Sequence, residues 1–537
     1  MKKITLSLVA LALSAISFAA PLNGAYTVGV DASNDYQSLK AACDAINAEQ
    51  ITGDVTLLIT SDLTEPANMG VQNPSEYTLT ITVDKAEDRK ITFTQTTDNA
   101  GPSGNLCIGC DATITHTCAS VLTQNVILDG SCEGEGQYLT LESAKGCHKL
   151  NGPVLVYGNV KNTTIKNCKL IVKNGAGSSI YPITVRSQKN TNNAPSNILI
   201  DGNYLEALSG ASDQGLYFQL TTSGNTPASD VTVSNNIIKA TTRGIFVNGL
   251  KNGTFIGNTI SVHQEGNMLS YGIWGYASMS GTFVVENNKI VELTTGALNG
   301  TNGIVGIAVG SGSDWVIRNN YISGFNVYST EADTIKISGI EGNSYANSAV
   351  IEHNTIVLPD QANGLLRPNV NMIRANGAEV RNNLLVSLEK DFANALIHNP
   401  SSKMSNNVYC TVAKVGSSET TKVFSDYQME VEATAKMVET VSFKDLAAGD
   451  LDLVAPSDGD LNLAVPALDS VTEDIYGTTR GEKTYAGAYE GGDFNEGPTT
   501  YIENVELAPQ TQKIIRDGQV LIIRDGKTYN MMGQEIR

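Results

Sequence analysis

Short runs of alternating apolar and variable residues recur along the chain, each with the same spacing around an asparagine. An apolar residue stands three positions before each Asn, and another stands two positions after it. The asparagines of this repeat are Asn203, Asn236, Asn258, Asn288, Asn320, Asn354, Asn383 and Asn407. Period-two alternation predicts strands with one buried face, and the repeat lacks the 3.6-residue spacing of a helix.

A second, weaker strand pattern precedes each Asn by 10 to 20 residues, in the segments YPITVRS, QGLYFQL, RGIFVNG, YGIWGYA, VGIAVGS, SGIEGNS, MIRANG and LIHNPS. Two short strands and a return every 22 to 34 residues make one coil of a solenoid. Asn suits a fixed corner, because it tolerates a left-handed backbone and its amide can bond both the backbone and the Asn one coil away. A β-sandwich with accidental asparagines does not explain eight copies at one offset.

The repeated G-I-x-V and I-x-N-N-x-I units resemble the right-handed parallel β-helix proteins of the pectate-lyase-like superfamily, over about residues 120–410. An amphipathic segment over 36–48, followed by VTLLIT at 55–60, is similar to the helical cap of such proteins. Residues 474–491 resemble the segment that often closes bacterial members. The resemblance implies an all-β fold: a right-handed parallel β-helix (solenoid) with an N-terminal helical cap and a small C-terminal β tail domain.

Both ends of the chain carry sorting patterns. Lys2 and Lys3, an apolar run and a small-x-small site predict a signal peptide and export. Residues 513–537 are similar to the C-terminal sorting tails of Bacteroidetes proteins that use the type IX secretion system, which implies the outer-membrane secretion machinery as a partner. The expected organisation is a signal peptide (1–19), cap and first coils (20–100), β-helix (101–492), linker (493–500) and sorting-type tail (501–537), in a secreted or cell-surface protein.

Charge and cysteine content narrow the function classes. Lys and Arg total 36 against 55 Asp and Glu, a net charge of −19, which argues against nucleic acid as a partner. No segment after the signal peptide approaches the ~18 apolar residues of a membrane span, so none is expected in the mature chain. Six of eight cysteines lie between Cys107 and Cys168. Export favours disulfides there over a zinc site formed by Cys107, Cys110, Cys118 and His148, because no second Cys-x-x-Cys pair is present.

The second strand pattern also predicts which side chains point away from the core. Because Cβ directions alternate along a strand, the residues between the buried positions form an outward file. This file places Tyr217, Phe246 and Trp274 on successive coils, although aromatic residues make up only 6% of the chain. Exposed rings flanked by amides suit sugar binding. The predicted binding residues are Tyr217, Phe246, Asn248, Trp274, Tyr276, Asn343 and Asn376. Rings covered by an inserted loop, forming a satellite core, are the alternative.

The same file continues with Glu341, Arg374 and His398, which supply a carboxylate, a guanidinium and an imidazole for acid–base cleavage of polysaccharide. An ordinary solvated strand face is the alternative, and no catalytic motif of the superfamily matches a position here. We therefore expect a polysaccharide-binding protein. An active lyase or glycosidase and an adhesin or spacer remain open alternatives. No metal ligand is assigned. The negative charge disfavours a strongly anionic glycan unless calcium bridges it.

Overall fold

The computed structural model describes residues 21–49, 51–66, 69–94, 104–110, 120–144, 152–173, 180–220, 224–266, 268–296, 303–327, 336–342, 349–358, 369–375, 377–387, 402–410, 415–417, 420–422, 424–495, 512–516, 519–524, 527–530 and 535–536. They divide into two units, residues 1–493 and 494–537. The predicted signal peptide, residues 1–19, lies outside the described residues. Among those described, no helix combines the length and apolar character that crossing a membrane requires.

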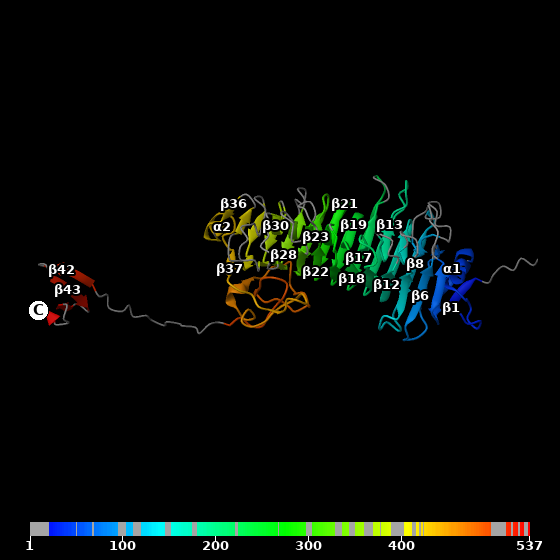
Figure 1. The fold of residues 1–537 in the computed structure, drawn as a ribbon, viewed down its shortest axis with the longest axis horizontal. Coiled ribbons are helices and arrows are strands. Elements are labelled where there is room, and N and C mark those ends of the chain that lie inside the picture. Colours follow the sequence, from blue (N-terminus) through cyan, green and yellow to red (C-terminus); the bar gives the residue numbers. More distant parts are fainter. Residues whose placement is uncertain are drawn as a thin grey trace, which may run out of the picture. The chain divides into compact units, whose positions relative to one another are not determined.

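The first unit is a parallel β-helix, which confirms the predicted fold (Figure 1). Each coil contributes strands to three parallel sheets. Sheet 1 contains β4 (Met69–Val71), β7 (Leu106–Ile108), β10 (Val154–Tyr157), β13 (Ile183–Arg186), β16 (Gln214–Gln219), the first parts of β19 (Arg243–Ile256) and β21 (Ser270–Glu286), β23 (Gly303–Val309), β27 (Lys336–Gly342) and β30 (Asn369–Arg374).

Sheet 2 carries the strand before each repeat Asn: β1 (Leu22–Val28), β2 (Ile51–Ile59), β5 (Leu79–Val83), β8 (Thr123–Asp129), β11 (Val160–Lys166), β14 (Ser196–Asp201), β17 (Ala228–Ser234), the later parts of β19 and β21, β24 (Asp314–Arg318), β28 (Ala349–Glu352), β31 (Glu379–Arg381) and β33 (Lys403–Ser405). Because β19 and β21 pass from sheet 1 into sheet 2, the two form one continuous 21-stranded sheet in the described part of the chain.

Sheet 3 carries the strand after each corner: β3 (Leu63–Pro66), β6 (Arg89–Thr94), β9 (Leu139–Ser143), β12 (Cys168–Val172), β15 (Tyr204–Ala207), β18 (Ile237–Ala240), β20 (Thr259–Val262), β22 (Lys289–Thr295), β25 (Tyr321–Ile322), β26 (Phe325–Val327), β29 (Thr355–Leu358), β32 (Leu384–Ser387), β34 (Val408–Cys410) and β37 (Lys436–Val438). Inward side chains of all three sheets form one buried apolar cluster, which runs from Leu22 to Ala435. No single coil could enclose such a core.

The repeat asparagines form a buried ladder at the corner between sheets 2 and 3. Each Asn donates from Nδ2 to the Oδ1 of the Asn one coil further on, at 2.9–3.0 Å. The ladder begins at the Cys168 backbone N–H and ends on the carboxylate of Glu432. The left-handed residue is the one before each ladder Asn, with φ of 50–68°. The amide bonding was therefore predicted correctly, but the left-handed backbone was assigned one position too late.

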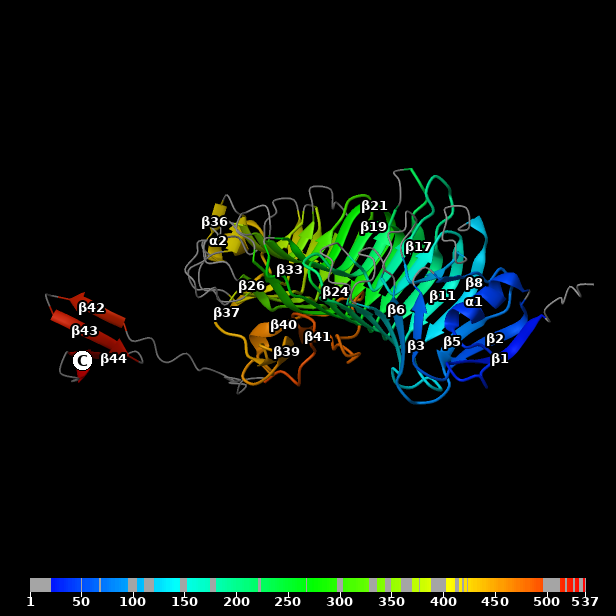
Figure 2. The ribbon, with the colours of Figure 1, turned by 45° about the vertical axis from the view of Figure 1, so that its right-hand side comes forward.

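Helix α1 (Leu39–Ala48) lies at the N-terminal end of the stacked strands (Figure 2). Its buried residues Leu39, Ala42, Cys43 and Ile46 belong to the apolar cluster, so α1 covers the open end of the core. The helix begins three residues later than the predicted start at Tyr36. Ser38 caps it by accepting from the Ala41 N–H, and the buried Glu65 carboxylate accepts from the Leu39 and Lys40 N–H groups.

After β34, the chain forms β35 (Val415–Ser417), β36 (Thr420–Lys422) and α2 (Phe424–Glu430). It then adds β37 to sheet 3 and returns along the solenoid. The returning segment contains β38 (Phe443–Asp445), β39 (Asp450–Leu453), a 3₁₀ turn (Leu461–Leu463), β40 (Ala464–Pro466) and β41 (Lys483–Tyr485). We call residues 443–493 the return segment. It bonds to the ladder corners: Arg480 donates to Asn319 Oδ1 at 2.9 Å, and the Asn319 Nδ2 donates to the Glu473 carbonyl at 2.8 Å.

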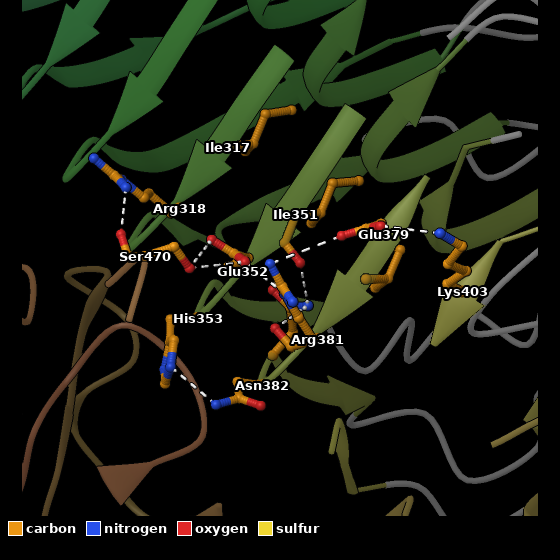
Figure 3. Close-up of polar contacts among 12 residues, drawn as sticks. Ile317, Arg318, Ile351, Glu352, His353, Glu379, Arg381, Asn382, Lys403 and Ser470 are labelled. Carbon is orange, nitrogen blue, oxygen red and sulfur yellow. Dashed lines mark hydrogen bonds and ion pairs between the residues drawn. The ribbon is translucent and has the colours of Figure 1, made fainter. Parts of the chain in front are cut away.

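Figure 3 shows this junction one coil further along. Ser470 donates to the buried Glu352 carboxylate at 3.0 Å, and Arg318 donates to the Ser470 carbonyl at 2.5 Å. His353 lies between the return segment and Asn382: its Nδ1 is 3.2 Å from the Gly487 carbonyl, and its Nε2 accepts from Asn382 at 3.0 Å. Burial, with the nearby guanidinium charges, holds the pKa of His353 well below its usual value.

The described cysteines differ from the predicted disulfide set. Cys43, Cys132, Cys168 and Cys410 are free thiols, while Cys110 is disulfide-bonded. The expectation that Cys132 and Cys168 take part in disulfides, for which no pairing was assigned, was therefore wrong. Cys168 instead occupies the first ladder position and belongs to the apolar cluster, where burial raises the pKa of its thiol.

The second unit contains β42 (Gln512–Arg516), β43 (Gln519–Arg524), β44 (Lys527–Asn530) and β45 (Glu535–Ile536). They pair in order as a four-stranded antiparallel sheet. Three strands were expected from the sequence over 513–537, and the short final strand makes the fourth.

Candidate functional site

The outward side of sheet 1 carries a straight file of side chains. Cα register pairs the residues of neighbouring coils in the order Thr184, Tyr217, Phe246, Trp274, Ala308, Glu341, Arg374. The flanking residues point into the core: Leu216 and Phe218, for example, are fully buried on either side of Tyr217. Strand alternation therefore places this file on the opposite side of the sheet from the core.

The rings of the file stack on one another. Ring centroids of Tyr217 and Phe246 are 4.9 Å apart with planes at 7°, and those of Phe246 and Trp274 are also 4.9 Å apart. Tyr181 extends the stack at one end, 4.6 Å from Tyr217, and Tyr271 packs 4.3 Å from Trp274. Because each ring covers its neighbour, Tyr217 and Phe246 are both only 9% exposed. In this part of the site a ligand can therefore contact the ring edges and the Tyr217 hydroxyl, but not open ring faces.

A second outward file lies beside the rings and is interrupted by a bulge. Arg186, Gln219 and Asn248 pair in register, but Asn248 lies opposite Ala277 instead of the expected Tyr276. Tyr276 is the unpaired residue of this bulge in β21. It is 54% exposed and contacts the Trp274 ring edge-on at 5.1 Å. Bulges re-aim side chains in this way and are common next to functional sites.

Two arginines join this surface that were not assigned to the site from the sequence. The Arg243 guanidinium lies 4.6 Å from the ring centroids of both Phe246 and Trp274, and that of Arg186 lies 6.0 Å from the Tyr157 ring. Tyr217 belongs to the coil between them. Burial raises the pKa of Tyr217, while hydrogen bonding to Asn248 and the two guanidinium charges oppose the rise.

Strict alternation of inward and outward side chains does not predict that Arg243 lies on the outer surface. Counting back two positions from the buried Ile245 would place Arg243 in the core. The strand instead turns at Gly244, where an added Cβ would meet the Ile260 side chain at 2.3 Å and the Gly272 carbonyl at 2.6 Å. Gly244 and Ile245 therefore both face the interior, and Arg243 emerges on the outer side. The only sequence signal was the Gly before each Ile of the repeat.

Of the three predicted catalytic residues, the structure brings two together. Glu341 and Arg374 lie on neighbouring strands, with Oε1 and Nη1 4.0 Å apart. Glu341 is 6% exposed, whereas the Arg374 side chain is 44% exposed. Burial, followed by the Glu341 carboxylate, raises the pKa of Tyr271 to about 12, so this hydroxyl stays protonated near neutrality. His398, Asn343 and Asn376 lie outside the described residues.

Two other features lie apart from this file. A cavity of about 610 Å³ is formed where the return segment meets the last coils, and its lining includes Lys436, Val465 and Lys483. In the described ranges, no group of three or more His, Cys, Asp or Glu side chains is arranged to hold a metal ion.

Comparisons with known proteins extend this description only at the level of fold. No protein-family model matches the chain, and no curated protein matches it. Among solved structures, a rhamnogalacturonan lyase is similar at 11% identity and a TM-score of 0.40, covering 72% of this chain and 87% of its own. Pectate lyase Pel9A is similar at 11% identity and a TM-score of 0.38, and the match covers 88% of this chain and 97% of the lyase. PfbA, a surface adhesin of Streptococcus pneumoniae, is similar at 13% identity and a TM-score of 0.32, and the match covers 71% of this chain and 87% of the adhesin.

Proposed function

We propose that this protein binds polysaccharide along the outward side of sheet 1. The observation that carries the proposal is the unbroken register of the outward file from Thr184 to Arg374. Positions on adjacent coils are about 4.8 Å apart, so seven of them extend over roughly 30 Å. An elongated ligand is therefore the kind that can use the whole file.

The side chains of the file favour a sugar ligand. Tyr276 offers an exposed ring, and Trp274 is half-buried beside it, so apolar sugar faces have a place to pack. The half-buried amides of Gln219 and Asn248 lie alongside and can bond sugar hydroxyls in either direction, since an amide both donates and accepts. The stacked rings of Tyr217 and Phe246 form a rigid floor that holds these groups in place.

Affinity electrophoresis across a panel of polysaccharides tests the proposal. We expect retardation by at least one polysaccharide, with affinity about tenfold weaker for Tyr276→Ala and for Trp274→Ala, a loss typical of an aromatic contact. Tyr77→Ala is the matched control, because Tyr77 is also an exposed tyrosine, 37% exposed, but lies near the N-terminal end of the chain. Retardation unchanged by both ring variants would exclude this surface, and no retardation by any glycan would favour an adhesin or spacer.

A polysaccharide lyase or glycosidase is the second candidate, and the Glu341–Arg374 pair favours it. A buried carboxylate beside a guanidinium and a protonated tyrosine, Tyr271, places a base, a charge stabiliser and an acid on one surface. This candidate predicts release of unsaturated or reducing products from a bound glycan. Glu341→Gln and Arg374→Gln should abolish that release while retardation persists, whereas binding without product would leave the protein a binding module.

We also propose that the N-terminal segment directs export of the protein and that the C-terminal tail directs its display at the cell surface. The charged and apolar start and the tail over 513–537 support this by their sequence patterns alone. Fractionation of cells that express the full chain should find it outside the cytoplasm, and deletion of residues 513–537 should trap it in the periplasm. Equal surface amounts with and without the tail would contradict the proposed sorting role.

A further inference from the structure

The cavity beside the return segment is built by other elements than the outward surface of sheet 1. β37 contributes to one side of it, and the 3₁₀ turn with β40 and β41 contributes to the other (Figure 2). Its volume of about 610 Å³ is typical of small-molecule sites, which combine apolar walls with a few polar groups that orient the ligand. The lining follows this pattern, with Leu461, Ala464, Val465 and Pro466 as its apolar residues and Asn406, Thr434, Lys436, Glu482 and Lys483 as its polar ones.

Asn406 is a ladder corner that the return segment leaves uncovered. At two earlier corners the equivalent amide donates to a carbonyl of the return segment: Asn319 to Glu473 at 2.8 Å, and Asn382 to Pro466 at 2.7 Å. Asn406 has the same left-handed backbone, with φ of 56°, and its half-buried side chain lines the cavity. Among the described residues, its amide has no hydrogen-bond partner. The cavity therefore has a free donor at the corner where two earlier coils receive an oxygen acceptor.

Two ammonium groups add positive charge to the same cavity. Lys436 donates from Nζ to the Ala464 carbonyl at 2.5 Å, which leaves two of its three N–H groups for other acceptors. Burial, followed by the charge of Lys483, lowers the pKa of Lys436, while the Asp460 carboxylate opposes this shift. In the part of the chain that the structure describes, neither lysine has a carboxylate within ion-pair distance. An anion in the cavity would offset the repulsion between the two ammonium groups and accept hydrogen bonds from them.

The rest of the lining limits the charge and the shape of that anion. Glu482 also lines the cavity, so two lysines and one glutamate give the lining a formal charge of +1, which a single negative charge balances. A second negative charge on the ligand would instead be repelled by Glu482. Leu461 is 42% exposed and Pro466 is exposed beside it, so the cavity also offers apolar surface that only an apolar group can cover favourably.

We infer that this cavity binds a small monocarboxylate that carries an apolar chain. Its carboxylate accepts from the Asn406 amide and from the ammonium groups of Lys436 and Lys483, and its apolar chain packs on Leu461 and Pro466. The ligand thereby joins the last coils to the return segment, as protein groups do at the earlier corners. This site is independent of the proposed glycan-binding surface.

Calorimetric titration of the full chain with four small probes tests the inference. Hexanoate, 1-hexanol and hexylammonium share one apolar chain and differ in the charge of the head group, while acetate has the carboxylate without the chain. We expect saturable binding of hexanoate at one site, about tenfold tighter than binding of any other probe. 1-Hexanol lacks the charge-assisted hydrogen bonds, hexylammonium is repelled by the lysines, and acetate leaves the apolar surface uncovered.

Substitutions in the lining locate the site. Lys483→Gln and Lys436→Gln should each weaken hexanoate binding about fivefold, and the double variant at least about tenfold, because each removes one ionic contact. Asn406→Gly removes the amide and keeps a residue that adopts the left-handed backbone without strain, so it should also weaken binding about fivefold.

The control variant is Lys403→Gln, which makes the same charge change on β33 at a side chain that is 85% exposed and pairs with Glu379. It should keep the wild-type affinity for hexanoate. Should Lys436→Gln break the contact with Ala464 and unfold the protein, the exposed Lys483 still decides the matter through Lys483→Gln. No saturable binding of hexanoate, equal affinity for hexanoate and 1-hexanol, tighter binding of hexylammonium, or unchanged affinity in Lys483→Gln would each overturn the inference.

Discussion

At the scale of single residues, the ladder asparagines join one coil to the next. The buried Asn320 amide donates to Asn354, Val285 and Arg318, and its Oδ1 accepts from both the backbone and the side chain of Asn288. Asn320→Ala would leave buried donors and acceptors on both neighbouring coils unsatisfied, each at about 1–3 kcal/mol. We expect a loss of about 3 kcal/mol in unfolding free energy, measured by urea denaturation. Asn326→Ala, at an exposed strand position, should cost little; equal losses would refute a structural role for the ladder.

His353 makes the stability of the folded protein depend on pH. Its pKa in the folded protein is held well below the ordinary value, so folding keeps the ring neutral. The unfolded state therefore binds a proton first as pH falls, and the stabilisation present above pH ~6.5 is progressively lost below it. The unfolding free energy should therefore fall steadily as the pH is lowered from 7 to 5.

The variant His353→Asn checks this linkage, because Asn occupies the same left-handed corner position at Asn319 and Asn382. It should fold and show a shallower loss of unfolding free energy between pH 7 and pH 5 than the wild type. Parallel pH profiles for the two proteins would show that His353 does not control this dependence.

At the scale of elements, a column of glycines near the start of the sheet 1 strands determines how closely neighbouring coils approach each other. Gly215, Gly244, Gly272, Gly306 and Gly339 precede the inward residue of successive strands, and a Cβ at each would meet the next coil's backbone or a core side chain at 2.6 Å or less. Gly244→Ala should therefore lower the unfolding free energy by about 2 kcal/mol, as overpacking does. Gly492→Ala is the control in thermal unfolding, because an added Cβ there would lie 3.6 Å from the nearest atom. Equal stability of the two variants would refute the close approach of the coils at Gly244.

Strand alternation predicted the outward file from Thr184 to Arg374, because each pair of buried residues fixes the direction of the residue between them. It could not predict departures from that rule. Tyr276 is displaced by a bulge, whose extra residue leaves no mark in an alternating pattern. Arg243 points away from the core only because the strand turns at Gly244. Whether the rings of neighbouring coils stack on one another or stay exposed depends on their rotamers, which the pattern does not specify.

At the scale of the whole molecule, the solenoid has one end covered by α1 and one flank covered by the return segment. The return segment supplies partners for polar groups that the corners bury. Asp452 accepts from the buried Tyr321 hydroxyl at 2.9 Å, and Thr355 accepts from the Ala488 N–H at 2.9 Å. A closed stack of coils would otherwise leave these groups without bonds, so we regard residues 443–493 as part of the body of the β-helix.

This view predicts different outcomes for two truncations. A chain that ends at residue 493 loses only the second unit, so its melting temperature should match that of the full chain. A chain that ends at residue 441 lacks one hydrogen-bond partner of each of the buried residues Tyr321, His353 and Glu352, and the loss of such a partner costs about 1–3 kcal/mol for each. Its melting temperature should fall by at least about 5 °C in a thermal scan followed by circular dichroism. Limited proteolysis should also cut it first at the exposed ladder corners; identical behaviour of both truncations would mean that the coils hold those corners without the return segment.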